Sequence, residues 1–102
     1  MLVAKTIIDQ IEIKSDGTLQ VRFAKRVYAD DTVIGEQYHR ISVVPGVAII
    51  GLLDAVDKHL ADMGFPNIED RSMILDAVST FHTPQRVTAY KAAEQARALI
   101  RN

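Results

Sequence analysis

The chain has 102 residues, of which 48% are hydrophobic and 25% are charged, and its formal net charge at pH 7 is −1. This length and composition are those of one folded globular domain and exclude an intrinsically disordered chain, and the near-neutral charge excludes a global attraction to nucleic acid or an anionic membrane. Because cysteine is absent, disulfide bonds, thiol catalysis and thiolate metal sites are excluded as well.

Neither a signal peptide nor a membrane span is expected. The N-terminal residues lack a charged segment followed by a long apolar stretch. The longest apolar run, Val47–Leu53, is much shorter than the about 18 residues that a transmembrane helix needs. We therefore expect a soluble protein, cytosolic where it is made, without a membrane partner.

The first strand is predicted from a period-two pattern that begins at residue 6. Ile7, Ile11 and Ile13 alternate with Ile8 and with polar residues, which predicts that Ile7 shares a buried face with Ile11 and Ile13. The segment 15–18 contains a glycine, which tolerates positive φ, and therefore predicts a tight hairpin turn.

Two further strands follow. The second has apolar residues at alternate positions, namely Leu19, Val21, Phe23 and Val27. Asp30-Asp31-Thr32 interrupts the pattern, β-branched residues resume it over 33–44, and Pro45-Gly46 ends it. Residues 6–44 are thus predicted to form a three-stranded antiparallel β-meander. Such a meander needs a cover for its apolar face.

The rest of the chain has helical periodicity. The first predicted helix has an apolar stripe at three-to-four residue spacing, formed by Ile49, Leu52, Leu53, Val56, Leu60 and Met63. Gly64 is placed for a left-handed C-terminal cap, and Pro66 prevents the helix from resuming. Asn67 is the predicted N-cap of the second helix, with Glu69 and Asp70 suited to the positive end of its dipole.

The predicted apolar face of the second helix is formed by Met73, Ile74, Ala77, Val78 and Phe81. Thr83 as N-cap and Pro84 at the first position start a third helix. Its apolar face is predicted to contain Val87, Tyr90, Ala93, Ala96 and Ile100. The prediction is an α+β fold in a single domain, 1–102, with the meander at 6–44 and three helices packing on the sheet over 47–101.

The three histidines are the first candidates for acid–base or metal chemistry. His39 shares strand parity with Ile41 and is expected to point inward as a structural residue, and His59 is expected on the wet side of the first helix. His82 is expected to contact a helix end or mark the turn before Thr83. None has the spacing of a metal motif, so no metal site and no cofactor are expected. A small metal-dependent enzyme that uses His39 or His82 with an aspartate stays open as an alternative.

Two other groups of polar residues have both a functional and a structural interpretation. Asp54 and Asp57 lie three apart, as paired catalytic or cation-binding carboxylates can, but a solvated helix face is the favoured interpretation. The second group is a basic and aromatic patch for single-stranded nucleic acid, formed by Arg22, Lys25, Arg26, Tyr28, Tyr38 and Arg40. Because Glu12 and Glu36 share the same sheet, no nucleic-acid partner is expected.

Several blocks are more distinctive than periodicity requires. They are Lys5–Ile13, Gly17–Arg22, Tyr38-His39-Arg40 through Val43-Val44-Pro45-Gly46, and Phe81-His82-Thr83-Pro84 through Val87–Ala92. In this order they resemble a family of small, uncharacterised or virion-associated proteins of tailed bacteriophages. The resemblance implies a phage protein of the tail or fibre region and implies no activity.

The stretch between Val47 and Phe65 departs from the family pattern, in which the Pro-Gly turn leads almost directly to the second helix. The first helix is therefore expected to be an insertion. If it buries its stripe against a partner and not its own sheet, the candidate partner interface is Ile49, Leu53, Val56 and Leu60.

The expected function is that of a non-enzymatic structural or assembly protein of a tailed-phage virion, an adaptor in the tail, baseplate or fibre. Its expected partners are other phage structural proteins, with a homo-oligomeric or ring-symmetric assembly, located in the virion and in the host cytoplasm during assembly. A fibre-assembly chaperone or a small regulatory binding protein is the alternative.

Overall fold

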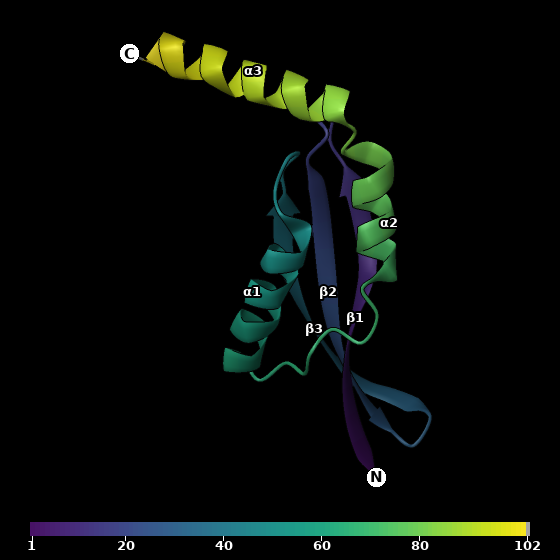
Figure 1. Ribbon diagram of the computed structural model, residues 1–102. Helices are drawn as coiled ribbons and strands as arrows, with labels where there is room; N and C mark the ends of the chain where they lie inside the picture. The colour runs from purple at the N-terminus through teal and green to yellow at the C-terminus, as the bar shows by residue number, and fades with distance from the viewer. Residues whose placement is uncertain (102) are drawn as a thin grey trace.

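The structure is a computed structural model that describes the backbone of residues 1–101 and the side chains of residues 1–99. An antiparallel sheet in the order β1-β2-β3 is formed by β1 (Leu2–Ile13), β2 (Leu19–Ala29) and β3 (Thr32–Val43). The helices that follow are α1 (Ile49–Asp62), α2 (Ser72–Phe81) and α3 (Pro84–Arg101). The predicted α+β class is confirmed (Figure 1).

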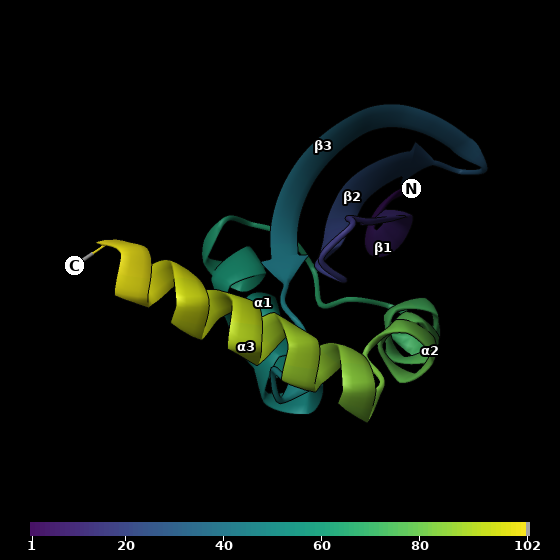
Figure 2. The same cartoon turned by 90° about the horizontal axis from the view of Figure 1, so that it is seen from above.

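The elements form two layers with one helix outside them. α1 and α2 lie side by side on one face of the sheet, and within residues 1–101 no helix covers the other face (Figures 1 and 2). α3 begins at the end of the sheet beside the β1–β2 turn and extends away from the body, which contributes to a longest dimension of 55 Å. The expected packing of helices on the sheet therefore applies to α1 and α2. The side chain of Ile100, expected on the apolar face of α3, lies outside the described residues.

The core lies between the sheet and these two helices. Its buried side chains from the strands are Ile8, Leu19, Val21, Phe23 and Val43, and those from the helices and their connection are Leu53, Val56, Leu60, Phe65, Ile68 and Ile74. Full burial of a side chain of this size is worth about 1.5–3 kcal/mol. Docking of α1 and α2 on the sheet therefore supplies the main hydrophobic stabilisation of the fold.

The candidate partner interface on α1 needs correction. Leu53 and Leu60 are fully buried, Val56 is 7% exposed, and Ile49 packs partly buried against the same core. The apolar stripe of α1 covers the chain's own sheet together with α2, since a three-stranded sheet needs a cover for its apolar face. These four side chains are thus not a free surface for a partner.

The alternation in β1 also differs from the prediction. Ile8 is 7% exposed and belongs to the core, whereas Ile7 is only half-buried and lies on the opposite face. The cause is a β-bulge, since Ile8 pairs with Phe23 but Gln10 pairs with Arg22, which leaves Asp9 as an extra residue. A bulge shifts the side-chain phase by one position, so Ile8 and Ile11 point to the same side although they are three residues apart.

The end of α1 is formed as predicted. Gly64 has a φ of +83°. Its N–H donates to the carbonyl of Ala61, and the N–H of Phe65 donates to the carbonyl of Leu60 at 2.8 Å. This is a Schellman motif, and its usual hydrophobic contact is supplied by Leu60 and Phe65, which are both buried in the core.

The start of α2 differs from the prediction. The helix begins at Ser72 with Arg71 at the N-cap position, and Asp70 Oδ1 accepts a hydrogen bond from the Ser72 N–H at 2.8 Å. Asn67 does not cap it, because the connection runs along the edge of β1: Ile68 forms a parallel bridge with Thr6, and the Glu69 N–H donates to the Thr6 carbonyl. Because residues 68 and 69 pair with β1, the helix starts later in the sequence than predicted.

The core position of α1 is testable by truncation. Leu53→Ala should lower the free energy of unfolding by about 2–5 kcal/mol, because it opens a cavity in a fully buried layer. Ile50→Ala on the exposed side of the same helix, where the residue is 57% exposed, should change it by about 0.5 kcal/mol or less. Urea denaturation measures both, and similar losses for the two variants would contradict the docking of α1 on the sheet.

Candidate functional site

The helix-free face of the sheet, called the open face below, presents ordered rows of side chains across the three strands. Strand register gives these rows, in order from the N-terminal end of β1, as Val3–Tyr28–Val33, Lys5–Arg26–Glu36, Ile7–Ala24–Tyr38, Gln10–Arg22–Arg40 and Glu12–Gln20–Ser42. The first row is apolar and aromatic, Tyr38 lies in the third row, and the charged side chains lie in the second, fourth and fifth rows. The open face is the candidate functional site.

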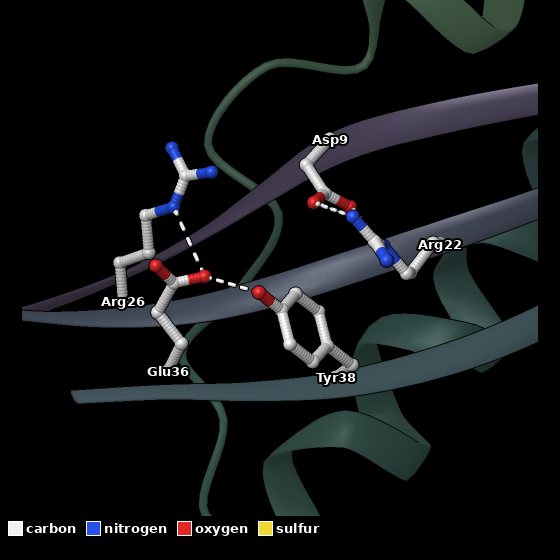
Figure 3. Close-up of polar contacts among 5 residues, drawn as sticks. All are labelled: Asp9, Arg22, Arg26, Glu36 and Tyr38. Carbon is white, nitrogen blue, oxygen red and sulfur yellow. Dashed lines mark hydrogen bonds and ion pairs between the residues drawn. The ribbon is translucent and has the colours of Figure 1, made fainter.

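A bidentate ion pair lies at the centre of the open face. The Arg22 Nε donates to Asp9 Oδ1 at 2.9 Å, and Nη2 donates to Oδ2 at 2.6 Å (Figure 3). The β-bulge places Asp9 and Gln10 together opposite Arg22, which lets the carboxylate reach the guanidinium in this geometry. Hydrogen bonding by Arg22 holds the pKa of Asp9 below its ordinary value.

Tyr38 connects this pair to β3. The Arg22 guanidinium carbon lies 4.4 Å from the centre of the Tyr38 ring, within cation–π distance. The Tyr38 hydroxyl donates to Glu36 Oε2 at 2.5 Å, and this bond raises the pKa of Tyr38. Glu36 Oε2 also lies 3.8 Å from Arg26 Nε (Figure 3). Five side chains from three strands thus form one connected polar network.

The apolar end of the open face lies beside this network. Val3 is 39% exposed and Val33 41% exposed, and both are cross-strand neighbours of Tyr28. Lys5 lies over the Tyr28 ring at 5.9 Å. The end of the sheet that contains this row extends beyond α1 and α2, so neither helix covers it (Figure 1). An exposed apolar group with a charged rim is typical of a contact surface.

The structure brings together most residues of the basic and aromatic patch that could bind single-stranded nucleic acid. Arg22, Arg26, Arg40, Tyr28 and Tyr38 all lie on the open face. Lys25 lies on the other side, with its Nζ 5.6 Å from the centre of the Phe65 ring. Arg22 and Arg26 are paired with Asp9 and Glu36, so much of the positive charge of the face is neutralised within the protein.

The three histidines have different surroundings. His39 faces the helix side, opposite Phe23 in the register, and its ring centroid lies 5.1 Å from that of His59 on α1. The His82 Nε2–H donates to the carbonyl of Gly17 at 2.7 Å, which ties the α2–α3 junction to the β1–β2 turn. Neither His39 nor His82 is hydrogen-bonded to an aspartate among the described residues.

Asp54 is 67% exposed, as the solvated-face interpretation expects, whereas Asp57 is only 14% exposed. Arg71 bridges them, with Nη1 3.1 Å from Asp54 Oδ1 and Nη2 2.5 Å from Asp57 Oδ2. Asp57 Oδ1 also accepts from the Ile68 N–H at 2.8 Å. The two carboxylates therefore hold the α1–α2 connection in place, which is a structural role.

A groove of about 500 Å³ separates the β1–β2 turn from the first turns of α3, with Arg86 and Tyr90 on the helix side. None of the functional hypotheses from the sequence falls in it. In the part of the chain that the structure describes, no helix is long and apolar enough to cross a bilayer.

Comparisons of the chain with protein-family models, with curated proteins and with solved structures find no match.

The Asp9–Arg22 pair predicts a specific pH dependence. Because the pKa of Asp9 is lowered in the folded state, the pair stabilises the fold above the unfolded-state pKa of about 3.9. This stabilisation is lost as the pH falls through the lower folded-state pKa. Asp9→Asn should therefore lower the free energy of unfolding by about 1–2 kcal/mol at pH 7. The variant should also lose less stability than the wild type when the pH is lowered.

Thermal unfolding between pH 7 and pH 2 measures this effect. Asp31→Asn, at an exposed position in the β2–β3 turn, is the matched control and should keep the wild-type pH profile below pH 5. Identical profiles for Asp9→Asn and the wild type would show that the ion pair does not stabilise the fold.

Proposed function

We propose that this chain works by protein–protein contact, as a structural or assembly component of a tailed-phage virion, and that the open face is its contact surface. The observation that carries the proposal is the apolar row Val3–Tyr28–Val33 beside the polar network that contains Arg22, Arg26 and Tyr38, on a sheet face that no helix covers within residues 1–101.

The chemistry of the open face fits a protein partner. Tyrosine and arginine are enriched at the energetic centres of protein interfaces, where apolar contact area and directed hydrogen bonds occur together. Tyr38 is 50% exposed although its hydroxyl is held by Glu36 and its ring by Arg22. The partner would therefore meet side chains that are already ordered, which lowers the entropic cost of binding.

Charge also favours a protein over nucleic acid. A phosphate backbone is bound by cations that are free to replace its counterions. Arg22 is held in a bidentate pair by Asp9, whose side chain is only 8% exposed, so this guanidinium would have to break a partly buried ion pair to bind phosphate. A protein surface with mixed charges can bind without breaking the Asp9–Arg22 ion pair.

The tail, baseplate or fibre placement comes from the family-like sequence blocks. It is an extension of the contact proposal and depends on it. A fibre-assembly chaperone would use the same surface transiently, whereas an adaptor in the virion would keep it covered in the finished particle.

Mass spectrometry of gradient-purified phage particles tests the proposal. The wild-type chain should be present in a fixed stoichiometry. Val33→Asp, which places a carboxylate in the apolar row at a position 41% exposed, should reduce incorporation about tenfold or more, because interface anchors contribute at least about 1.4 kcal/mol each.

Ile50→Asp, on the exposed side of α1, is the matched control and should be incorporated normally. Circular dichroism of both purified variants verifies that they fold. Normal incorporation of Val33→Asp would overturn the open face as the contact surface. Absence of the wild-type chain from particles would overturn the virion role, and formation of soluble fibre trimers only on co-expression would then indicate the chaperone.

A further inference from the structure

Two imidazole rings from different layers of the fold face one another beside the core. His39 lies on β3 and points to the helix side of the sheet, and His59 lies in the last turn of α1. Their ring centroids are 5.1 Å apart and their planes are inclined by 48°. Docking of α1 on the sheet thus brings together two residues that are twenty positions apart in the sequence.

Neither ring makes a hydrogen bond with the residues that the structure describes. Among the residues whose side chains the structure describes, the only histidine with a hydrogen bond is His82. His39 is half-buried and His59 is exposed, and neither has a fully buried ring nitrogen without a partner. Both rings therefore have ring nitrogens that remain accessible to a ligand.

The separation of the rings matches a shared metal ion. With Zn–N distances of about 2.0–2.1 Å and a tetrahedral angle at the metal, two bound imidazoles have ring centroids about 5 Å apart. The observed centroid separation of 5.1 Å is close to this value. Imidazole is a preferred ligand of borderline metals such as Zn²⁺, Ni²⁺ and Cu²⁺, and a poor one for Mg²⁺ and Ca²⁺.

We propose that His39 and His59 form a two-histidine site for a borderline divalent transition metal, with Zn²⁺ as the test ion. No group of three or more histidine, cysteine, aspartate or glutamate side chains in the described residues is placed to hold a metal. The remaining coordination positions of the ion are therefore open to water or to an added ligand. A bound ion would link the C-terminal turn of α1 to β3.

The site is independent of the proposed contact surface. His39 and Tyr38 are neighbours in the sequence but point to opposite faces of the sheet, since Tyr38 pairs with Ala24 on the open face. Loss of metal binding therefore says nothing about the open face, and a failed virion experiment says nothing about the metal.

Titration of the purified chain with Zn²⁺, followed by imidazole NMR signals, tests the site directly. The signals of His39 and His59 should shift together, and that of His82, whose Nε2 is held by Gly17, should stay in place as an internal control. A tenfold excess of Zn²⁺ over its Kd should raise the Tm by about 5–10 °C, because metal that binds only the folded state stabilises it. Mg²⁺ at the same concentration should have no effect.

His39→Phe and His59→Phe keep a ring in the contact and remove its nitrogens. Each should weaken Zn²⁺ binding at least about tenfold, since even the loss of an outer-shell partner costs about 10–100-fold. The Tm of each variant without metal shows whether ring packing is preserved. Equal Zn²⁺ affinity in the wild type and both variants, or a shift of the His82 signal in place of the other two, would overturn the proposal.

Discussion

Burial of one face of the sheet by α1 and α2 is the constraint on which the rest of the structure depends. The fully buried Phe23 on β2 and Leu53 and Leu60 on α1 belong to the same core, so the two layers exclude water from each other. Since α3 extends away from the body, the opposite face of the sheet has no cover within residues 1–101 (Figure 2). That face must be compatible with water, and the rows on either side of its Ile7–Ala24–Tyr38 row are accordingly charged.

A single extra residue in β1 connects these two requirements. The bulge at Asp9 lets Ile8 and Ile11 both point toward the helices, and it places a carboxylate on the other side opposite Arg22. The same irregularity therefore completes the apolar layer and anchors the polar network. Loss of the bulge would turn either Ile8 or Ile11 toward solvent, because a shift of one residue exchanges the two faces of a strand.

β3 contributes a side chain to each of the two proposed sites, which lie on opposite faces of the sheet. Tyr38 contributes to the ordered network of the open face, and the next residue, His39, faces His59 on α1. The strand is an edge strand, paired only with β2 among the described residues, and its successive side chains point to opposite faces of the sheet. Protein contact and metal binding, the two proposals made for this chain, therefore involve adjacent positions but different layers.

The sequence by itself determined the elements whose signals are local. Alternation in β2, the hairpin glycine at position 17, the Gly64 cap and the Thr83-Pro84 helix start all depend on neighbouring residues, and the structure has each of them. Such signals are readable because backbone conformation and side-chain periodicity are set within a few residues.

Tertiary structure alone decided which surfaces are covered and which side chains meet. The apolar stripe of α1 has the same sequence pattern whether it packs on a sheet or on a partner. Periodicity therefore could not place Leu53 in the core. The bulge at Asp9, the Arg71 bridge to Asp54 and Asp57, and the His39–His59 contact join residues far apart in the chain or depend on strand register. Such contacts arise only when the layers dock, because their energies come from pairing across elements and not from local propensity.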